Sequence, residues 1–342
     1  MKLDKNKVLL NELVSLIEDG RRQLSFAANA TITLTYWRVG KRINDDILKN
    51  KRAGYGKQIV ETISQQLIAH YGSNYGVKNL RRMMQFAQVF DDEQIVVPLV
   101  RQLSWTHFLL LIPLKNPLQR DFYTQMCGIE NWTKRTLQQK IDGMLFERTA
   151  ISKKPKALIK KELAALKETN QLTPDLVFKD PYFLDFTGLK DTYSEQSLED
   201  AILREMEKFI LELGMGFTFV ERQKRMIIDG EDFHLDLLFF HRKLKRLVAI
   251  ELKLGKFKAA YKSQMELYLR WLEENDRQPN EETPIGLLLC AEGNREQIEL
   301  LQLEKAGIKI AEYLTELPNK KLLQQKLHKT IEIANANKEN KK

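Results

Sequence analysis

Apolar residues in the first 150 positions recur every three or four residues, which is the spacing of amphipathic helices. Glycine, asparagine and proline separate these runs, and Ser73, Ser104 and Thr133 stand where helices would begin. We therefore predict a helical N-terminal domain over residues 1–150. Its helices are expected at Lys7–Leu24, Asn29–Asn50, Gly56–His70, Val77–Val89, Trp105–Leu111, Pro117–Gly128 and Thr133–Phe146.

The pattern changes after residue 150. Residues 151–174 are rich in lysine, leucine and alanine and are interpreted as a charged, exposed linker helix. Residues 175–318 alternate short apolar runs with helical spacing, which predicts a second, α/β domain with a central mixed sheet flanked by helices. The expected elements are helix Leu198–Leu213, strands Phe217–Gln223 with Met226–Ile228, Phe233–Phe240 and Arg246–Leu254, helix Phe257–Asn275, strand Ile285–Cys290, helix Arg295–Ala306 and strand Ile308–Tyr313. The basic tail, residues 319–342, is expected to be partly disordered.

Two of the predicted strands carry charge where a buried strand normally carries apolar residues. Because side chains alternate across a strand, Asp236, Glu251 and Lys253 fall on charged faces near the strand ends, and Arg246–Leu254 keeps its opposite face apolar. An ordinary ion pair would account for one acid and one base, but two acids accompany a single lysine. A divalent cation, Mg²⁺ or Mn²⁺, would balance the second carboxylate.

Such an ion could hold a phosphodiester and activate a water molecule, with Lys253 orienting that water or stabilising developing negative charge. A Glu-x-Lys triplet is common by chance, so the context matters. Gln264 interrupts an aromatic helix face and is either a partly exposed amide or a group directed at the phosphate. Glu199 is either a further metal ligand or a first-turn acid that complements the helix dipole after Ser197.

The composition fits a protein of two domains, with 342 residues, 43% hydrophobic and 30% charged. A formal net charge of +9 favours polyanionic partners. The longest apolar runs are too short to span a membrane, and acidic residues interrupt the N-terminal helix, unlike a secretion signal. We expect a cytoplasmic protein that does not associate with membranes, in which Cys127 and Cys290 are free and buried.

The arrangement of Asp236, Glu251-x-Lys253 and Gln264 resembles the PD-(D/E)XK nuclease superfamily, and longer segments resemble the YhcG family within it. Those segments are DPYFLDFTGLKDTYSEQSLEDAIL, LELGMGFTFVERQKRM, FHLDLLFFHRKLKRLVAIELKLGKF and QMELYL in the second half, and YWRVGKRI, NLRRMMQFAQVF, QLSWTHFLLL and NWTKRTLQQKIDGMLFERT in the first. The resemblance covers residues 10–313. It implies a restriction-endonuclease-like domain in which Asp236 and Glu251, with Glu199, bind the metal and Lys253 and Gln264 take part in catalysis. The superfamily's proline upstream of the aspartate is absent, since His234 stands at that place.

The N-terminal domain is expected to recognise the target or to supply dimer contacts. Lys78, Arg81 and Arg82 begin a helix that follows a Gly- and Asn-rich turn, as in a helix-turn-helix second helix, and are candidate nucleic-acid ligands together with Lys256. A solvated basic face on a structural helix is the alternative.

Our leading hypothesis is a Mg²⁺-dependent DNA endonuclease. The alternative is a non-catalytic nucleic-acid-binding or assembly module that keeps the nuclease fold, and RNA is a further candidate substrate. We also consider a homodimer, because one active site cuts one strand and a duplex has two.

Overall fold

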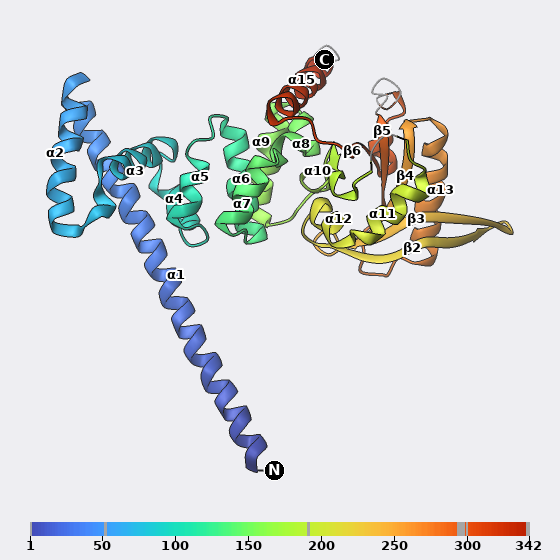
Figure 1. The fold of residues 1–342 in the computed structure, drawn as a ribbon, viewed down its shortest axis with the longest axis horizontal. Helices are drawn as coiled ribbons and strands as arrows, with labels where there is room; N and C mark the ends of the chain where they lie inside the picture. The colour runs from blue at the N-terminus through green and yellow to red at the C-terminus, as the bar shows by residue number, and fades with distance from the viewer. Residues whose placement is uncertain (1, 51–52, 190–191, 293–297, 299, 340–342) are drawn as a thin grey trace. The chain divides into compact units, whose positions relative to one another are not determined.

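The computed structural model describes residues 2–50, 53–189, 192–292, 298 and 300–339 of the chain. It divides into two compact units, residues 1–141 and residues 142–342. The elements of the first unit are helices, whereas the second contains a mixed six-stranded sheet with flanking helices, which confirms the predicted fold class (Figure 1). The division lies before the expected boundary at residue 150, because Met144 packs against Leu323 and Leu327 of the second unit.

The first unit contains longer helices than its sequence pattern indicated. Its elements are α1 (Lys2–Asn50), α2 (Ala53–Tyr71), the 3-10 helix η1 (Ser73–Tyr75), α3 (Val77–Val89), α4 (Glu93–Leu99), α5 (Trp105–Leu111), α6 (Pro117–Glu130) and α7 (Lys134–Asp142). Two predicted helices form the single helix α1, because the residues between them include no helix breaker. Helix α4 was not predicted and contains Pro98.

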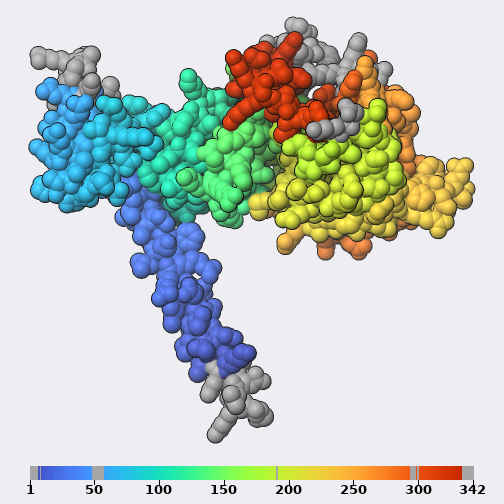
Figure 2. Space-filling view, in the orientation of Figure 1, coloured from blue at the N-terminus to red at the C-terminus, as the bar shows by residue number. Residues whose placement is uncertain are grey.

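The C-terminal part of α1 packs on α3. Tyr36 and Ile43 share a core with Val60, Leu80 and Met83. The N-terminal part of α1 is different, and in Figure 2 it stands clear of the other helices of the same unit. Its large apolar side chains are about half exposed or more, and they include Leu9, Leu10, Leu13, Val14, Leu16, Ile17, Leu24 and Phe26. One helix therefore has a buried half and an unpaired apolar half.

The second unit is built around the sheet. Its elements are α8 (Leu145–Arg148), η2 (Ala150–Lys153), α9 (Lys156–Thr169), α10 (Pro174–Val177), β1 (Tyr182–Phe183), η3 (Asp185–Thr187), α11 (Glu195–Arg204), α12 (Met206–Leu213), β2 (Phe217–Ile228), β3 (Glu231–His241), β4 (Arg246–Lys256), α13 (Ala260–Asn275), β5 (Ile285–Glu292), η4 (Leu303–Ala306), β6 (Ile308–Leu314) and α15 (Lys320–Glu339).

The strands lie in the order β1-β6-β5-β4-β3-β2. The pairs β2/β3 and β3/β4 are antiparallel, and β4/β5, β5/β6 and β1/β6 are parallel. Phe239 of β3 meets Phe209 of α12, whereas its neighbour Leu238 belongs to the core formed with Met265 and Leu272 of α13. Because adjacent strand residues face opposite sides, α12 and α13 cover opposite faces of the sheet.

The segment predicted to be an exposed linker is instead packed within the second unit. Helix α9 buries Ile159, Leu163 and Leu166, whose spacing places them on one face. The tail, which was expected to be partly disordered, contains the helix α15. Residues 340–342 of the tail lie outside the described part of the chain. Of the predicted helix Arg295–Ala306, residues 295–297 and 299 are not described, and its end forms the 3-10 helix η4.

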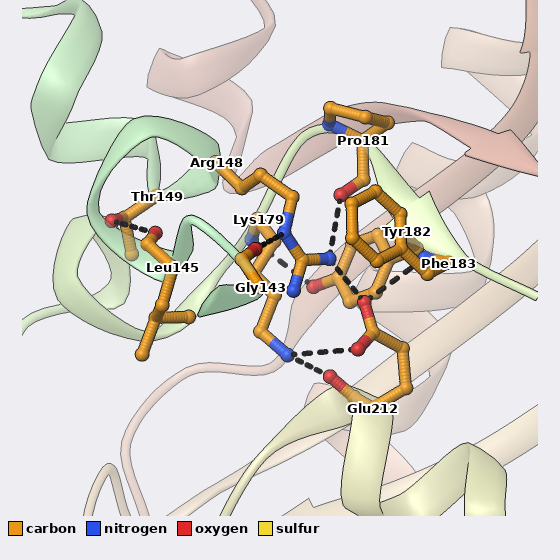
Figure 3. Close-up of polar contacts among 9 residues, drawn as sticks. All are labelled: Gly143, Leu145, Arg148, Thr149, Lys179, Pro181, Tyr182, Phe183 and Glu212. Carbon is orange, nitrogen blue, oxygen red and sulfur yellow. Dashed lines mark hydrogen bonds and ion pairs between the residues drawn. The ribbon is translucent and has the colours of Figure 1, made fainter. Parts of the chain in front are cut away.

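A buried ion cluster connects α8, β1 and α12 (Figure 3). Arg148 donates to Oε1 of Glu212 at 2.6 Å and lies over the ring of Phe183, 3.6 Å from its centroid. Lys179 contacts the backbone carbonyl and the carboxylate of Glu212. The neighbouring cations hold the pKa of Glu212 below its usual value although burial acts in the opposite direction. These charges compensate each other, so the cluster is structural.

Cys127 and Cys290 are free and buried, as predicted. Burial raises the pKa of both thiols to about 12. Over the part of the chain that the structure describes, no helix is both long enough and apolar enough to cross a membrane.

Candidate active site

Asp236 of β3 and Glu251 of β4 lie together where the pairing of their strands ends. The last paired residues are Leu237 and Ile250. Beyond them, the backbone N–H of Asp236 donates to Oε1 of Glu251 at 3.3 Å, and Oδ2 of Asp236 accepts from the N–H of Leu252 at 2.8 Å. Beyond the paired residues, each carboxylate thus accepts a hydrogen bond from a backbone N–H of the other strand. These two hydrogen bonds fix the acids next to each other.

Lys253 lies against this pair. Its Nζ is 2.7 Å from Oε2 of Glu251, its side chain is 12% exposed, and it lies 5.5 Å from the ring centroid of Tyr261. Burial acts to lower the pKa of Lys253, but the charge and hydrogen bond of Glu251 outweigh it and the pKa is raised. The lysine is therefore a fixed positive charge at neutral pH.

Glu199 reaches the site from α11. The helix begins after Ser194, whose side chain accepts from the N–H of Ser197, and not after Ser197 as the sequence suggested. Glu195 therefore occupies the first turn and Glu199 lies beyond it. Glu199 is therefore not a first-turn acid that complements the helix dipole, which was the alternative to a metal ligand. Its side chain is buried and the residue is 3% exposed. The predicted helix Leu198–Leu213 is interrupted at Glu205, the residue between α11 and α12.

Gln223 of β2 connects Glu199 to Asp236. Its Nε2 donates to Oε2 of Glu199 at 2.8 Å and to Oδ1 of Asp236 at 3.3 Å. Arg222 places its guanidinium 3.4 Å from Oε1 of Glu199. Gln223 was not among the predicted site residues. The signal that could have found it was the interruption of the predicted strand between Gln223 and Met226.

All three carboxyl groups are electrostatically unfavourable as anions. Burial, followed by the charge of Asp236, raises the pKa of Glu251 to about 7. Burial is also the largest cause that raises the pKa of Asp236 and of Glu199. Lys253 acts in the opposite direction on Asp236 and Glu251. The positive charge supplied by the protein is thus smaller than the site would need to keep every acid ionised.

The donor set suits a hard divalent cation. Asp236 and Glu251 offer carboxylate oxygens, and Oε1 of Glu199 is buried without a hydrogen-bond partner, although Arg222 pairs with it. Among the residues that the structure describes, no group of three or more Asp, Glu, His or Cys side chains is arranged as a complete metal site. Two carboxylates suffice for Mg²⁺, because this ion commonly keeps several waters and takes further oxygens from a phosphate.

Gln264 lies on α13, where its Nε2 donates to Oη of Tyr268 at 2.7 Å. Tyr268 in turn donates to the carbonyl of His234 at 3.4 Å. The contacts found for Gln264 therefore lead to the backbone two residues before Asp236 and not to a carboxylate. Burial raises the pKa of Tyr268, and the charges of the two acids act on it as well.

The predicted nucleic-acid ligands are in both units. Lys78 and Arg81 are exposed on α3 and Arg82 is half-buried. Lys256, at the end of β4, is exposed and lies 3.6 Å from Glu292.

The sequence matches known family models over both halves. A DUF1016 N-terminal domain model matches residues 12–148, and a YhcG PDDEXK nuclease domain model matches residues 175–328. The protein named "Putative nuclease YhcG" from Escherichia coli (strain K12) is 33% identical over an alignment of 352 positions, which covers 93% of this chain and 92% of that protein.

Solved structures resemble only part of the chain. A repair endonuclease from Pyrococcus abyssi is 26% identical with a TM-score of 0.26, over 38% of this chain and 50% of that one. A structure of an EndoMS–dsDNA complex is 20% identical with a TM-score of 0.27, over 38% and 48%. The chain thus spans about half the length of these proteins. By its near full-length similarity to the Escherichia coli protein, the chain belongs to the YhcG family, in which a DUF1016 N-terminal domain precedes a YhcG PDDEXK nuclease domain.

Proposed function

We propose that the chain is a metal-dependent endonuclease that hydrolyses phosphodiester bonds in DNA. The observation that carries this proposal is the buried pair of Asp236 and Glu251 beside Lys253, in which burial and the neighbouring acid raise the pKa of Glu251 to about 7. A pair of acids in contact, with strongly perturbed pKa values, is typical of functional sites.

Each residue has a role that follows from its contacts. Asp236 and Glu251, with Glu199 close to them, would hold Mg²⁺ or Mn²⁺. When bound, the ion would polarise the scissile phosphate and lower the pKa of an attacking water. Because its own pKa is raised, Lys253 keeps its proton and stabilises negative charge that develops on the phosphate. Gln264 would act at a distance, through Tyr268.

The test is cleavage of duplex, branched and single-stranded DNA and of RNA, with Mg²⁺ or Mn²⁺ and with EDTA. The double variant Glu251→Ala/Lys253→Ala should lose all cleavage. Its control is Asp142→Ala/Lys320→Ala, which removes an exposed ion pair of the same unit and should cleave normally. Binding that is indifferent to EDTA, with no cleavage of any substrate, would favour the non-catalytic module instead. Cleavage of RNA alone would correct the substrate.

We propose that Lys78, Arg81 and Arg82 of α3 contact phosphates, as does Lys256. The exposure of Lys78 and Arg81 on one short helix supports this role. Each lost phosphate contact should lower the salt dependence of binding by about one unit of slope. Arg81→Gln should therefore bind every sequence more weakly with a shallower slope, whereas Arg21→Gln on α1 should bind normally. A slope equal to that of the wild type would exclude Arg81.

We further propose a homodimer formed through α1. Leu10, Ile17 and Leu24 recur every seven residues and are 59%, 57% and 71% exposed. A seven-residue apolar repeat on an unpaired helix is typical of coiled-coil pairing with a second helix. A second copy also supplies the second active site that scission of a duplex requires.

Light scattering during gel filtration tests this pairing. Replacing all three residues by Gln keeps the helix propensity and should convert a dimer to a monomer. The control variant Ile68→Gln/Tyr71→Gln removes exposed apolar residues of α2 and should remain dimeric. A monomeric wild type at every concentration would rule out the dimer.

A further inference from the structure

Gln223 has a backbone conformation that is unusual for its place in the fold. Its φ is +46°, in the left-handed region, although it lies inside β2. The strand pairing continues on both sides of it, because Arg222 pairs with Leu237 and Lys224 with Leu235. A residue other than glycine seldom adopts this conformation, which lowers stability unless its surroundings compensate.

The other residues of this kind have ordinary explanations. Among the described residues, the remaining non-glycine positions with positive φ lie at helix ends or in turns: Asn131, Met144, Asn170, Asp229, Lys245 and Gln302. At such positions a left-handed residue ends a helix, precedes one or reverses the chain. Neither explanation applies to Gln223, so another cause must be sought in what its side chain contacts.

The side chain of Gln223 joins two acids from different elements. Both hydrogen bonds of its Nε2 go to carboxylates, to Oε2 of Glu199 on α11 and to Oδ1 of Asp236 on β3. Oδ2 of Asp236 is already fixed by the N–H of Leu252. Gln223 thus fixes the second oxygen of Asp236 and sets its position relative to Glu199.

We propose that Gln223 is a positioning residue of the nuclease site, whose amide holds Asp236 and Glu199 in the arrangement that receives the divalent cation. The inference rests on the proposed metal-dependent function and deepens it. The residue with the left-handed backbone is the one whose amide lies between the two carboxylates. Removing a group that orients metal ligands commonly weakens metal affinity by roughly 10- to 100-fold.

The experiment measures Mn²⁺ binding to the full-length protein by calorimetry, without nucleic acid. Gln223→Gly keeps the left-handed backbone without strain but removes the amide. Gln223→Asn also tolerates this backbone, but its amide is one methylene too short. Both should bind Mn²⁺ roughly 10- to 100-fold more weakly than the wild type. In cleavage assays both should lower kcat at saturating nucleic acid and leave KM for nucleic acid unchanged.

The matched control is Lys245→Gly, since Lys245 has a φ of +50° and lies in an exposed turn of the same unit. It relieves the same kind of strain and should bind Mn²⁺ like the wild type. If Gln223→Gly or Gln223→Asn binds Mn²⁺ as the wild type does, the amide has no positioning role and the inference is wrong. If the wild type itself neither binds Mn²⁺ nor cleaves, the proposed function fails and this inference fails with it.

Discussion

Replacing Glu251 by Gln should stabilise the metal-free protein at alkaline pH while it abolishes cleavage. The substitution keeps the shape of the side chain and removes its charge. In the folded chain that charge is unfavourable, because burial and the adjacent Asp236 raise the pKa of Glu251 to about 7 from an ordinary value of 4.5. The attraction of Lys253 is already included in this balance.

The sign and size of the effect follow from proton linkage. A carboxyl group whose pKa is higher in the folded chain than in the unfolded chain makes the folded chain bind more protons between about pH 4.5 and pH 7. Stability therefore falls as the pH rises through this window, and the full penalty applies above it. A pKa difference of this size corresponds to about 3 kcal/mol. For a unit of this size, we expect a rise in melting temperature of roughly 6 to 12 °C at pH 8.

Differential scanning calorimetry in EDTA tests this prediction, because it can separate the transitions of the two units. At pH 8 the transition of the second unit should shift upward in Glu251→Gln, and at pH 4.5 the variant and the wild type should agree. Added Mn²⁺ should stabilise the wild type and not the variant. Glu292→Gln, an exposed acid on β5, is the control and should leave the transition unchanged. A variant less stable than the wild type at pH 8 in EDTA, or one that still cleaves, would refute the reasoning.

Three further predictions concern packing in the first unit and two buried charged groups of the second unit. Gly40→Ala should destabilise the first unit in a thermal melt, because the added Cβ would lie 1.9 Å from a backbone carbonyl oxygen of α3. The control is Gly20→Ala in the same helix, whose Cβ would meet nothing within 4 Å and which should be neutral or stabilising. Burial lowers the pKa of His241 to about 4, so the free energy of unfolding of the wild type should fall by up to about 3 kcal/mol as the pH is lowered from 6.5 to 4. In urea unfolding experiments across this pH range, His241→Asn should not show this loss. Arg148→Met should cost about 3 kcal/mol in urea unfolding, because it leaves Glu212 buried with fewer partners, and a loss below about 1 kcal/mol would contradict this account.

Local patterns predicted those elements whose ends are marked by the sequence. Helices α3 and α5 have the predicted bounds, because Gly76 and Ser104 stand before them. Strands β2 to β6 agree within a few residues, since their apolar runs are bounded by turn residues such as Asp229 and Gly230, whereas the two-residue strand β1 was not predicted. Helix α4 was missed because Pro98 argues against a helix, although Asp92 caps its start by accepting from the N–H of Gln94.

The residues of the candidate site also differ in how well local sequence patterns could predict them. Glu251 and Lys253 are two residues apart on one strand, so their spacing alone places them on one face. Asp236 lies on the preceding strand, so its position in the site could also be predicted. Glu199 comes from a helix whose start was misplaced by three residues, because both Ser194 and Ser197 can cap it. The choice between such caps depends on tertiary packing, which a sequence pattern does not contain.

Features that weaken the fold gather at one place in the second unit. The left-handed backbone of Gln223 and the raised pKa values of Glu199, Asp236 and Glu251 all lower the stability of the protein without a bound metal ion. The charges of the Arg148 cluster, in contrast, compensate each other within the fold. Residues whose conformation or charge lowers the stability of the fold are expected where function requires them. If the proposed function is right, substitutions that remove the unfavourable acids should raise stability and lower activity together, whereas substitutions in the Arg148 cluster should lower stability without a separate effect on metal binding.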